Sequence, residues 1–142
     1  MPYRYSMLAS EMDIDAVWNL LRGTYWSPDI RREIVERAMA NSIVIGVFDE
    51  ESGEQVAYAR VVTDRATFAW LCDVIVHEEH RGQGLSVGML ERLIAHPDLQ
   101  TLRRWMLATR DAHKLYERYG FVQILPERWM ERKAAPGVWQ ER

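Results

Sequence analysis

A glycine-bearing segment of this 142-residue chain, residues 80–88 with the sequence HRGQGLSVG, carries the clearest sign of chemistry. It lies between an apolar run typical of a buried strand and a segment with helical spacing of apolar residues. Glycines let a backbone approach a ligand closely and adopt a positive φ. The helix that starts near Ser86 leaves its first amides unpaired, and its dipole adds partial positive charge. Together these features predict a diphosphate site.

Two familiar phosphate-binding loops do not fit this segment. A Walker loop ends in Gly-Lys-Ser/Thr, and no lysine is present here. A dinucleotide fingerprint has the spacing G-x-G-x-x-G, whereas Gly82, Gly84 and Gly88 are spaced G-x-G-x-x-x-G and follow hairpin strands. A tight strand-to-helix turn without a ligand is the plain structural alternative.

The apolar run before this loop contains one acid, Asp73. A charge in an apolar strand is costly unless it is paired or functional. Two interpretations stay open: a base or amine-binding group, or an ion pair, for instance with Arg60. The neighbouring Cys72 is expected to be a small buried residue rather than a nucleophile.

Composition sets the class of protein. The chain is 48% hydrophobic and 27% charged, as expected of one globular domain. The single cysteine, Cys72, excludes an internal disulfide and a cysteine-rich zinc module, and favours a reduced, cytoplasmic setting. His-Glu-Glu-His at 77–80 is one residue short of a zinc-protease helix motif, so we expect no metal site. A net charge of −3 and the absence of a long apolar run argue against nucleic-acid and membrane partners.

The elements that must position these residues follow the order β-α-α-β-β-β-α-β-α-β. Helices are predicted after a cap at Asp13 or Asp15, from Ser27 to about Ala40, from Ser86 to Ala95 and, capped by Asp111, to Tyr119. The predicted strands are 3–8, 42–48, 55–63, 68–76, 102–108 and 121–125. This order predicts an α/β fold with a mixed antiparallel–parallel central sheet of about six strands flanked by helices. We expect one domain over residues 1–133 and a loose tail over 134–142.

Two stretches of the chain resemble the GNAT (general N-acetyltransferase) superfamily. Arg81-x-x-Gly84-x-Ser86 resembles the signature Arg/Gln-x-x-Gly-x-Gly/Ala, with serine as the one departure. DVIVHEEHRGQGLSVGML resembles the central strand, pyrophosphate loop and helix of that family. LATRDAHKLYERYGF resembles its second conserved segment, which ends in Tyr-x-x-x-Gly-Phe. The resemblance covers about residues 3–125 and implies the acyl-CoA N-acyltransferase fold.

The resemblance also implies where acetyl-CoA, the acyl donor, binds. Backbone amides of the glycine loop would hold the pyrophosphate, and the backbone of the splayed central strand would pair with the pantetheine arm. Asp111 would lie close to the CoA chain, and one of Arg103, Arg104 or Arg110 would contact the 3′-phosphate. The implied donor-binding residues are Val74, Ile75, Val76, Arg81, Gly82, Gln83, Gly84, Leu85, Ser86, Val87 and Asp111.

The catalytic and acceptor residues follow from the same resemblance. Tyr116 matches the tyrosine that gives a proton to the departing thiolate, and Asp73 would assist the attacking amine. Tyr25 and Trp26 lie on the loop that walls the acceptor pocket, where their aromatic surfaces would hold an amine cation or a ring. On their own these aromatic residues are equally consistent with packing.

The sequence therefore predicts an acetyl-CoA-dependent N-acetyltransferase that acts by direct attack of a primary amine. We expect a small-molecule acceptor. The alternative is a non-catalytic acyl-CoA-binding sensor on the same fold. A homodimer is common in the family, and Trp129 and Trp139 near the C-terminus would either serve such a contact or cover the sheet of their own chain.

Overall fold

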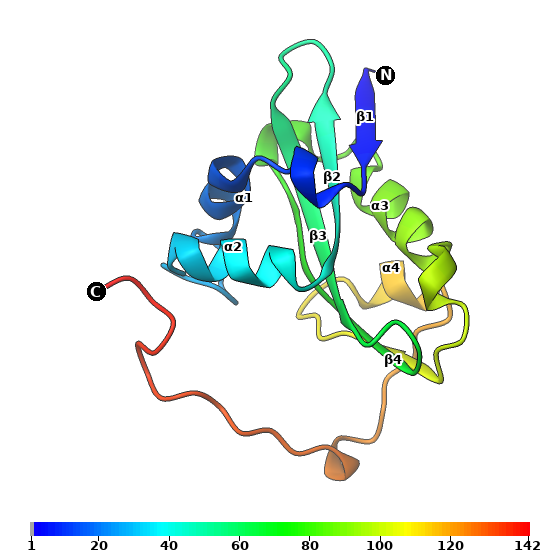
Figure 1. Cartoon of the computed structure of the whole chain (residues 1–142). Coiled ribbons are helices and arrows are strands. Elements are labelled where there is room, and N and C mark those ends of the chain that lie inside the picture. The colour runs from blue at the N-terminus through cyan, green and yellow to red at the C-terminus, as the bar shows by residue number, and fades with distance from the viewer. Residues whose placement is uncertain (1) are drawn as a thin grey trace.

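A computed structural model describes residues 2–142 of the chain. Its centre is a five-stranded sheet in the order β1-β2-β3-β4-β5, antiparallel except for the last pair (Figure 1). The strands are β1 (Tyr3–Ser6), β2 (Ile43–Asp49), β3 (Gln55–Thr63), β4 (Phe68–Val76) and β5 (Arg104–Met106). The predicted α/β fold with a mixed sheet is confirmed.

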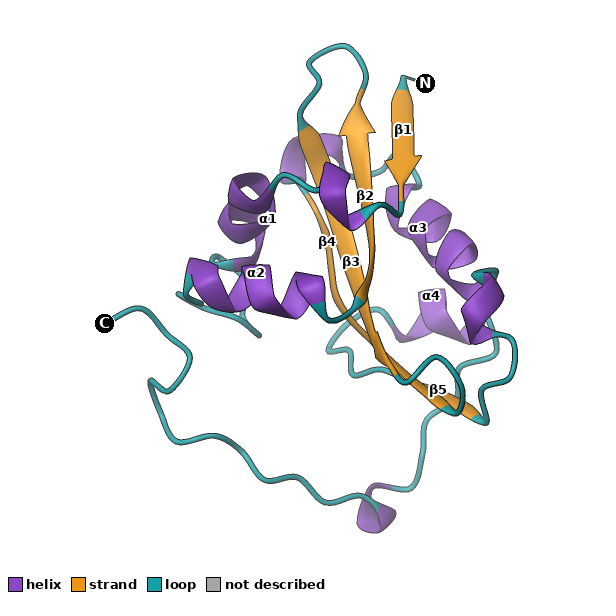
Figure 2. Cartoon of the chain, in the orientation of Figure 1, coloured by secondary structure: helices purple, strands orange, loops and turns teal. Residues whose placement is uncertain are grey.

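Helices cover both faces of the sheet. Figure 2 shows α1 and α2 on one face, and α3 and α4 on the other. They span α1 (Ile14–Leu21), α2 (Arg32–Ala40), α3 (Leu85–Ile94) and α4 (His113–Glu117). Successive strand residues point to opposite faces, so neighbours such as Val44 and Ile45 enter different cores. Residues buried on both faces explain why β2 and β3 have near-continuous apolar sequences.

Two of the predicted helix starts differ in outcome. Of the two candidate caps for α1, Asp13 is the one present, because its Oδ1 accepts a hydrogen bond from the amide of Ala16 at 3.1 Å. The prediction that the second helix opens at Ser27 is wrong, since α2 begins at Arg32. Asp29 has a left-handed φ of 57°, which a helical turn cannot contain.

The predicted sixth strand, residues 121–125, is not a strand in this structure. Gly120, with φ 89°, ends the last helical turn, and the chain then leaves the sheet without pairing with β5. It runs in an extended arc before its final residues meet the segment before α2 (Figure 1). Among residues 2–142, no helix is long and apolar enough to cross a membrane.

Strand β4 diverges from β5 partway along its length. The two strands pair only at residues 68–70 and 104–106. The register of β4 against β3 shifts between Tyr58 and Arg60, and Asp73 opposite this irregularity has a φ of 55°. Such bulges bend a strand and increase its twist. The second half of β4 therefore faces an opening instead of a neighbouring strand.

Candidate functional site

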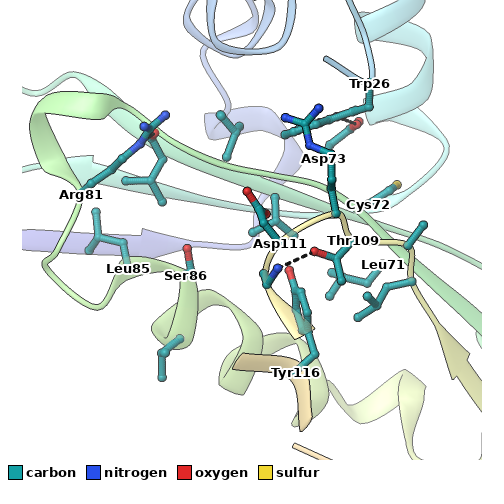
Figure 3. A pocket seen from close by; sticks show the side chains of 18 of the residues that line it. Trp26, Leu71, Cys72, Asp73, Arg81, Leu85, Ser86, Thr109, Asp111 and Tyr116 are labelled. Atoms are coloured by element: carbon teal, nitrogen blue, oxygen red, sulfur yellow. Dashed lines mark hydrogen bonds between the residues drawn. The ribbon is translucent and has the colours of Figure 1, made fainter. Parts of the chain in front are cut away.

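The opening beside β4 is a pocket of about 1010 Å³. It is walled by the second half of β4, the glycine loop and the segment that follows β5 (Figure 3). The remaining wall is the loop after α1 that carries Tyr25 and Trp26, which we call the aromatic loop. These walls come from segments up to about 90 residues apart in sequence. The pocket brings together every predicted site residue except Gln83, which does not line it.

The glycine loop has the backbone that a bound anion requires. Gly82 and Gly84 have φ values of 78° and 75°, and Gly84 is the N-cap of α3 without a side-chain cap. The first amides of α3 are therefore available to a ligand. A Cβ on either glycine would meet no atom within 4 Å, so these glycines serve the backbone conformation rather than packing. The loop thus fits a pyrophosphate.

Side chains around the loop hold it in place. Nε of Arg81 donates a hydrogen bond to the carbonyl of Val76 at 3.2 Å, which ties the loop to the end of β4. Gly88 has a packing role, because a Cβ there would collide with the hydroxyl of Tyr5. The third glycine of the segment is therefore explained without a ligand.

The far half of β4 offers its backbone to the pocket. Val76 and Ile75 pair with Ala57 and Tyr58 of β3 on one side. On the other side, β5 pairs with β4 only as far as Trp70. No strand among residues 2–142 pairs with residues 74–76 on this side, and Arg81 takes the Val76 carbonyl, so the other outward backbone groups can pair with a ligand that has amides of its own.

Asp73 lies at the bend of β4 with both carboxylate oxygens engaged. Nε of Arg60 donates to Oδ2 at 2.8 Å, and Nε1 of Trp26 donates to Oδ1 at 3.1 Å. The two charged side chains are only 19% and 11% exposed. Burial opposes the charge of Arg60, but Asp73 and Cys72 outweigh it and raise the pKa of that guanidinium. The predicted ion pair is present, and it also holds the aromatic loop.

Cys72 lies beside the Arg60–Asp73 ion pair, and its thiol is unreactive near neutral pH. Burial raises the pKa of its thiol to about 12, with Arg60 opposing and Asp73 adding to the shift. The thiolate is the nucleophilic form of cysteine, so a thiol with this pKa is a poor nucleophile near neutral pH.

Tyr116 rises from α4 with its hydroxyl directed at the pocket (Figure 3). Its ring packs edge-on against Phe121 at 5.9 Å. Burial, and then the nearby Asp111 and Tyr25, raise the pKa of this phenol. The hydroxyl is therefore protonated well beyond neutral pH, as a proton donor must be.

The prediction that Asp111 caps the last helix is wrong. The N-cap of α4 is Ala112, and the hydroxyl of Thr109 accepts a hydrogen bond from the amide of Ala112 at 3.0 Å. Because Thr109 satisfies that amide, the carboxylate of Asp111 is left to the pocket, where Figure 3 shows it. A threonine three residues before Ala112 was the signal for this cap.

Arg110 lies against the aromatic loop at the wall of the pocket. The guanidinium carbon of Arg110 lies 3.8 Å from the ring centroid of Tyr25, which meets Trp26 edge-on at 5.0 Å. Sequence reasoning grouped Arg110 with Arg103 and Arg104, but neither of those two lines the pocket. Arg110 differs from Arg103 and Arg104 because the course of the chain after β5 brings it to the pocket.

A sequence profile described as "Acetyltransferase (GNAT) domain" matches residues 41–123, which include the glycine loop, the bend of β4 and Tyr116. The chain belongs to the GNAT acetyltransferase family. A Gibberella zeae protein named as an acetyltransferase is 34% identical over 111 residues. That match covers 76% of this GNAT chain and 60% of the fungal protein, so the chain spans less than two thirds of its curated relative.

One solved structure of the family resembles nearly all of the chain. A Xanthomonas campestris protein of the GNAT family is 44% identical, with a TM-score of 0.89 over 98% of this chain and 97% of its own.

More distant structures share the fold. Glucosamine-6-phosphate N-acetyltransferase of Arabidopsis thaliana has a TM-score of 0.67 at 16% identity, over 96% of this chain and 99% of its own. The ribosomal-protein-S18-alanine N-acetyltransferase of Escherichia coli has a TM-score of 0.70 at 21% identity, over 87% and 79%. One name gives a sugar phosphate and the other a protein, so the fold alone does not select the acceptor.

Proposed function

We propose that this protein is an acetyl-CoA-dependent N-acetyltransferase that transfers the acetyl group to a primary amine by direct attack. One observation carries the proposal: the opening between β4 and β5 has an anion-binding loop at one end and the Tyr116 hydroxyl inside it. A donor with a diphosphate, an amide-bearing arm and a thioester matches these parts in that order.

Donor binding uses backbone more than side chains. Amides at Gly82, Gly84 and the first turn of α3 face the pyrophosphate, while Arg81 keeps the loop in place. The outward backbone groups of residues 74–76, apart from the Val76 carbonyl that Arg81 holds, pair with the pantetheine arm. Asp111, whose carboxylate does not cap α4, lies beside that arm.

The transfer itself needs one nucleophile and one acid. The neutral amine attacks the thioester carbonyl, the carbon–sulfur bond breaks, and Tyr116 gives its proton to the departing thiolate. The raised pKa of Tyr116 keeps the phenol protonated but makes it a weaker acid, so the proposed transfer depends on the hydroxyl lying close to the sulfur as the carbon–sulfur bond breaks. The proton lost by the amine passes to water, and the Tyr116 phenoxide regains a proton from water, so the products are the N-acetylated amine and the free CoA thiol.

Asp73 positions the acceptor site in this proposal. Its carboxylate accepts hydrogen bonds from Arg60 and Trp26, so both oxygens already have partners. We propose that this contact holds Trp26, and with it Tyr25, as the wall against which a small-molecule amine lies. No metal takes part in the proposed reaction, and the chain's setting is proposed to be the cytoplasm.

Thiol release from acetyl-CoA, measured with a panel of primary amines, tests the proposal. We expect turnover with at least one amine and a loss of about 10²–10³-fold in kcat for Tyr116→Phe. Tyr119→Phe is the matched control, because the Tyr119 hydroxyl bonds Glu91 and does not line the pocket. Donor binding without turnover, unchanged in Tyr116→Phe, would identify an acyl-CoA sensor instead. No affinity for acetyl-CoA would refute both.

A further inference from the structure

A second cavity, of about 690 Å³, adjoins the pocket beside β4. The two cavities share six lining residues: Tyr25, Trp26, Ile75, Val76, Arg81 and Arg110. Beyond these, the pocket beside β4 extends to Tyr116 and the start of α3, whereas the second cavity extends to Asn19 and Leu20 of α1. Because α1 and α3 cover opposite faces of the sheet (Figure 2), the two cavities extend toward opposite faces and meet at the end of β4.

The second cavity gives the acceptor its own route to the reacting atoms. In the proposed transfer, the donor fills the pocket beside β4 from the glycine loop to Tyr116. An amine that attacks the thioester must come from a side that the donor leaves open. None of residues 82–87 lines the second cavity, which meets the pocket at the aromatic loop. The lining of the second cavity therefore selects the acceptor.

Charges of both signs line the second cavity. Glu78 and Glu79 contribute two carboxylates, and Arg81 and Arg110 contribute two guanidiniums, so the formal charges cancel when His77 is neutral. Arg81 is partly used within the protein, because its Nε donates to a backbone carbonyl at the end of β4. The two glutamates and Arg110 are exposed and can meet a ligand. Since opposite charges attract across a binding surface, this lining suits a ligand that carries a positive and a negative group.

Arg110 is the member of this lining that is best prepared to bind an anion. Five arginines of the described chain stack on an aromatic ring. Arg4 and Arg22 also pair with a glutamate, and Arg92 donates to a carbonyl of α3. Arg110 and Arg104 have neither contact within the described chain, and of these two only Arg110 lines either cavity. Stacking fixes the plane of the Arg110 guanidinium and leaves the N–H groups in that plane to a ligand.

We propose that the acceptor is an amine that also carries a carboxylate, as amino acids do, and that Arg110 binds this carboxylate through two parallel hydrogen bonds. This inference rests on the proposed transfer reaction and names its substrate class. The carboxylate lies at Arg110, the body of the acceptor lies against Tyr25 and Trp26, and the amine reaches the pocket beside β4. The amine nitrogen bonds to the acetyl carbon as the carbon–sulfur bond breaks, and the carboxylate is unchanged.

A carboxylate suits this place better than a phosphate does. Its two oxygens lie in one plane and match the parallel N–H groups of a guanidinium. It also brings a single negative charge, which the unpaired Arg110 balances. A phosphate monoester carries nearly two negative charges, and the second would face Glu78 and Glu79 in the same cavity.

Matched pairs of amines test the inference. Thiol release from acetyl-CoA is measured with an amino acid and with the amine that lacks only its carboxylate. Suitable pairs are alanine and ethylamine, phenylalanine and phenethylamine, and ornithine and putrescine. We expect at least one amino acid to be used with a kcat/KM about 10–100-fold above that of its partner, which is the effect of one charge-assisted pair of hydrogen bonds.

Variants of Arg110 show whether that preference comes from its guanidinium. Arg110→Gln should abolish the preference by raising the KM for the amino acid. Loss of the stacking on Tyr25 would affect both members of a pair equally, so the ratio between them reports carboxylate binding alone. Arg110→Lys keeps the charge without the two parallel N–H groups and should retain part of the ratio. Arg118→Gln is the matched control, since Arg118 is exposed and lines neither cavity, and it should leave the ratio unchanged.

Contact of Arg110 with the 3′-phosphate of CoA is the competing explanation. In that case Arg110→Gln would raise the KM for acetyl-CoA but not the KM for its 3′-dephospho analogue, and the inference would be overturned. A preference for phosphoethanolamine over every amino acid would overturn it as well. Equal use of both members of every pair would overturn the inference and leave the proposed function standing. Donor binding without turnover of any amine would overturn both.

Discussion

Replacing Asp73 with asparagine separates the two roles open to this carboxylate. The substitution keeps the shape of the side chain and an oxygen that can accept from Trp26 or Arg60. It removes the negative charge that faces Arg60 at 2.8 Å. Asparagine also tolerates the left-handed backbone at this position, so strain adds little. The variant therefore isolates the charge.

The cost in stability follows from burial. Removing one partner of a buried ion pair costs about 3–5 kcal/mol, because the other charge stays buried alone. Here the side chains are 19% and 11% exposed, and the asparagine oxygen retains one hydrogen bond. We expect a loss of about 2–3 kcal/mol, which lowers the thermal midpoint by about 10 °C. Arg60→Met in the Asp73→Asn background should recover part of that loss, since no charge is then left unpaired.

Activity decides between the roles. If Asp73 positions Trp26, kcat should stay within about 10-fold of the native value. The acidic limb of the plot of kcat against pH should also stay in place. A fall of about 10²–10⁴-fold with a displaced acidic limb would refute the positioning role and make Asp73 the base. Asp29→Asn is the matched control: Asp29 also has a left-handed φ, of 57°, but is exposed and forms no ion pair in the described chain. It should change neither quantity.

Three further outcomes are expected. Gly84→Ala should raise the KM for acetyl-CoA by about 10-fold, measured in steady state, because alanine disfavours the φ of 75° by about 1–2 kcal/mol; an unchanged KM would exclude this loop from donor binding. Cys72 should react with iodoacetamide at pH 8 roughly 10³-fold slower than a free thiol, since its pKa is about 12. The same shift makes the native state hold the Cys72 proton more tightly than the unfolded chain does. The free energy of unfolding should therefore fall from pH 9 to 12, and Cys72→Ala should flatten that fall in urea titrations.

The sequence predicted the elements whose local signals agree. The bounds of β3 and β4 match the predicted 55–63 and 68–76, because turn residues flank each apolar run. The glycine loop and α3 also lie where their spacing placed them. These features depend on neighbours in sequence, which a pattern can reveal.

Other features depend on partners distant in sequence. Ser27-Pro28-Asp29 reads as a helix start, yet these residues form a turn in which the Ile30 amide donates to the Ser27 carbonyl, and the final residues of the chain pair with residues 29–31. The segment 121–125 has strand character, but pairing needs an edge beside it, which the chain's own path does not provide. The contact of Arg110 with Tyr25 likewise arises only when two loops meet. The sequence pattern of a segment indicates which secondary structure it favours, but it does not indicate which distant segment will pack against it.

The bend at Asp73 restricts what evolution can place there. The backbone at this position accepts glycine, asparagine or aspartate, since other residues are strained at a φ of 55°. The side chain must also be an anion short enough to meet Arg60. Only aspartate meets both demands while Arg60 is present. Positions 60 and 73 are thus expected to drift together, with a neutral residue at one accompanying a neutral residue at the other, so this pair should covary more tightly than the pocket around it.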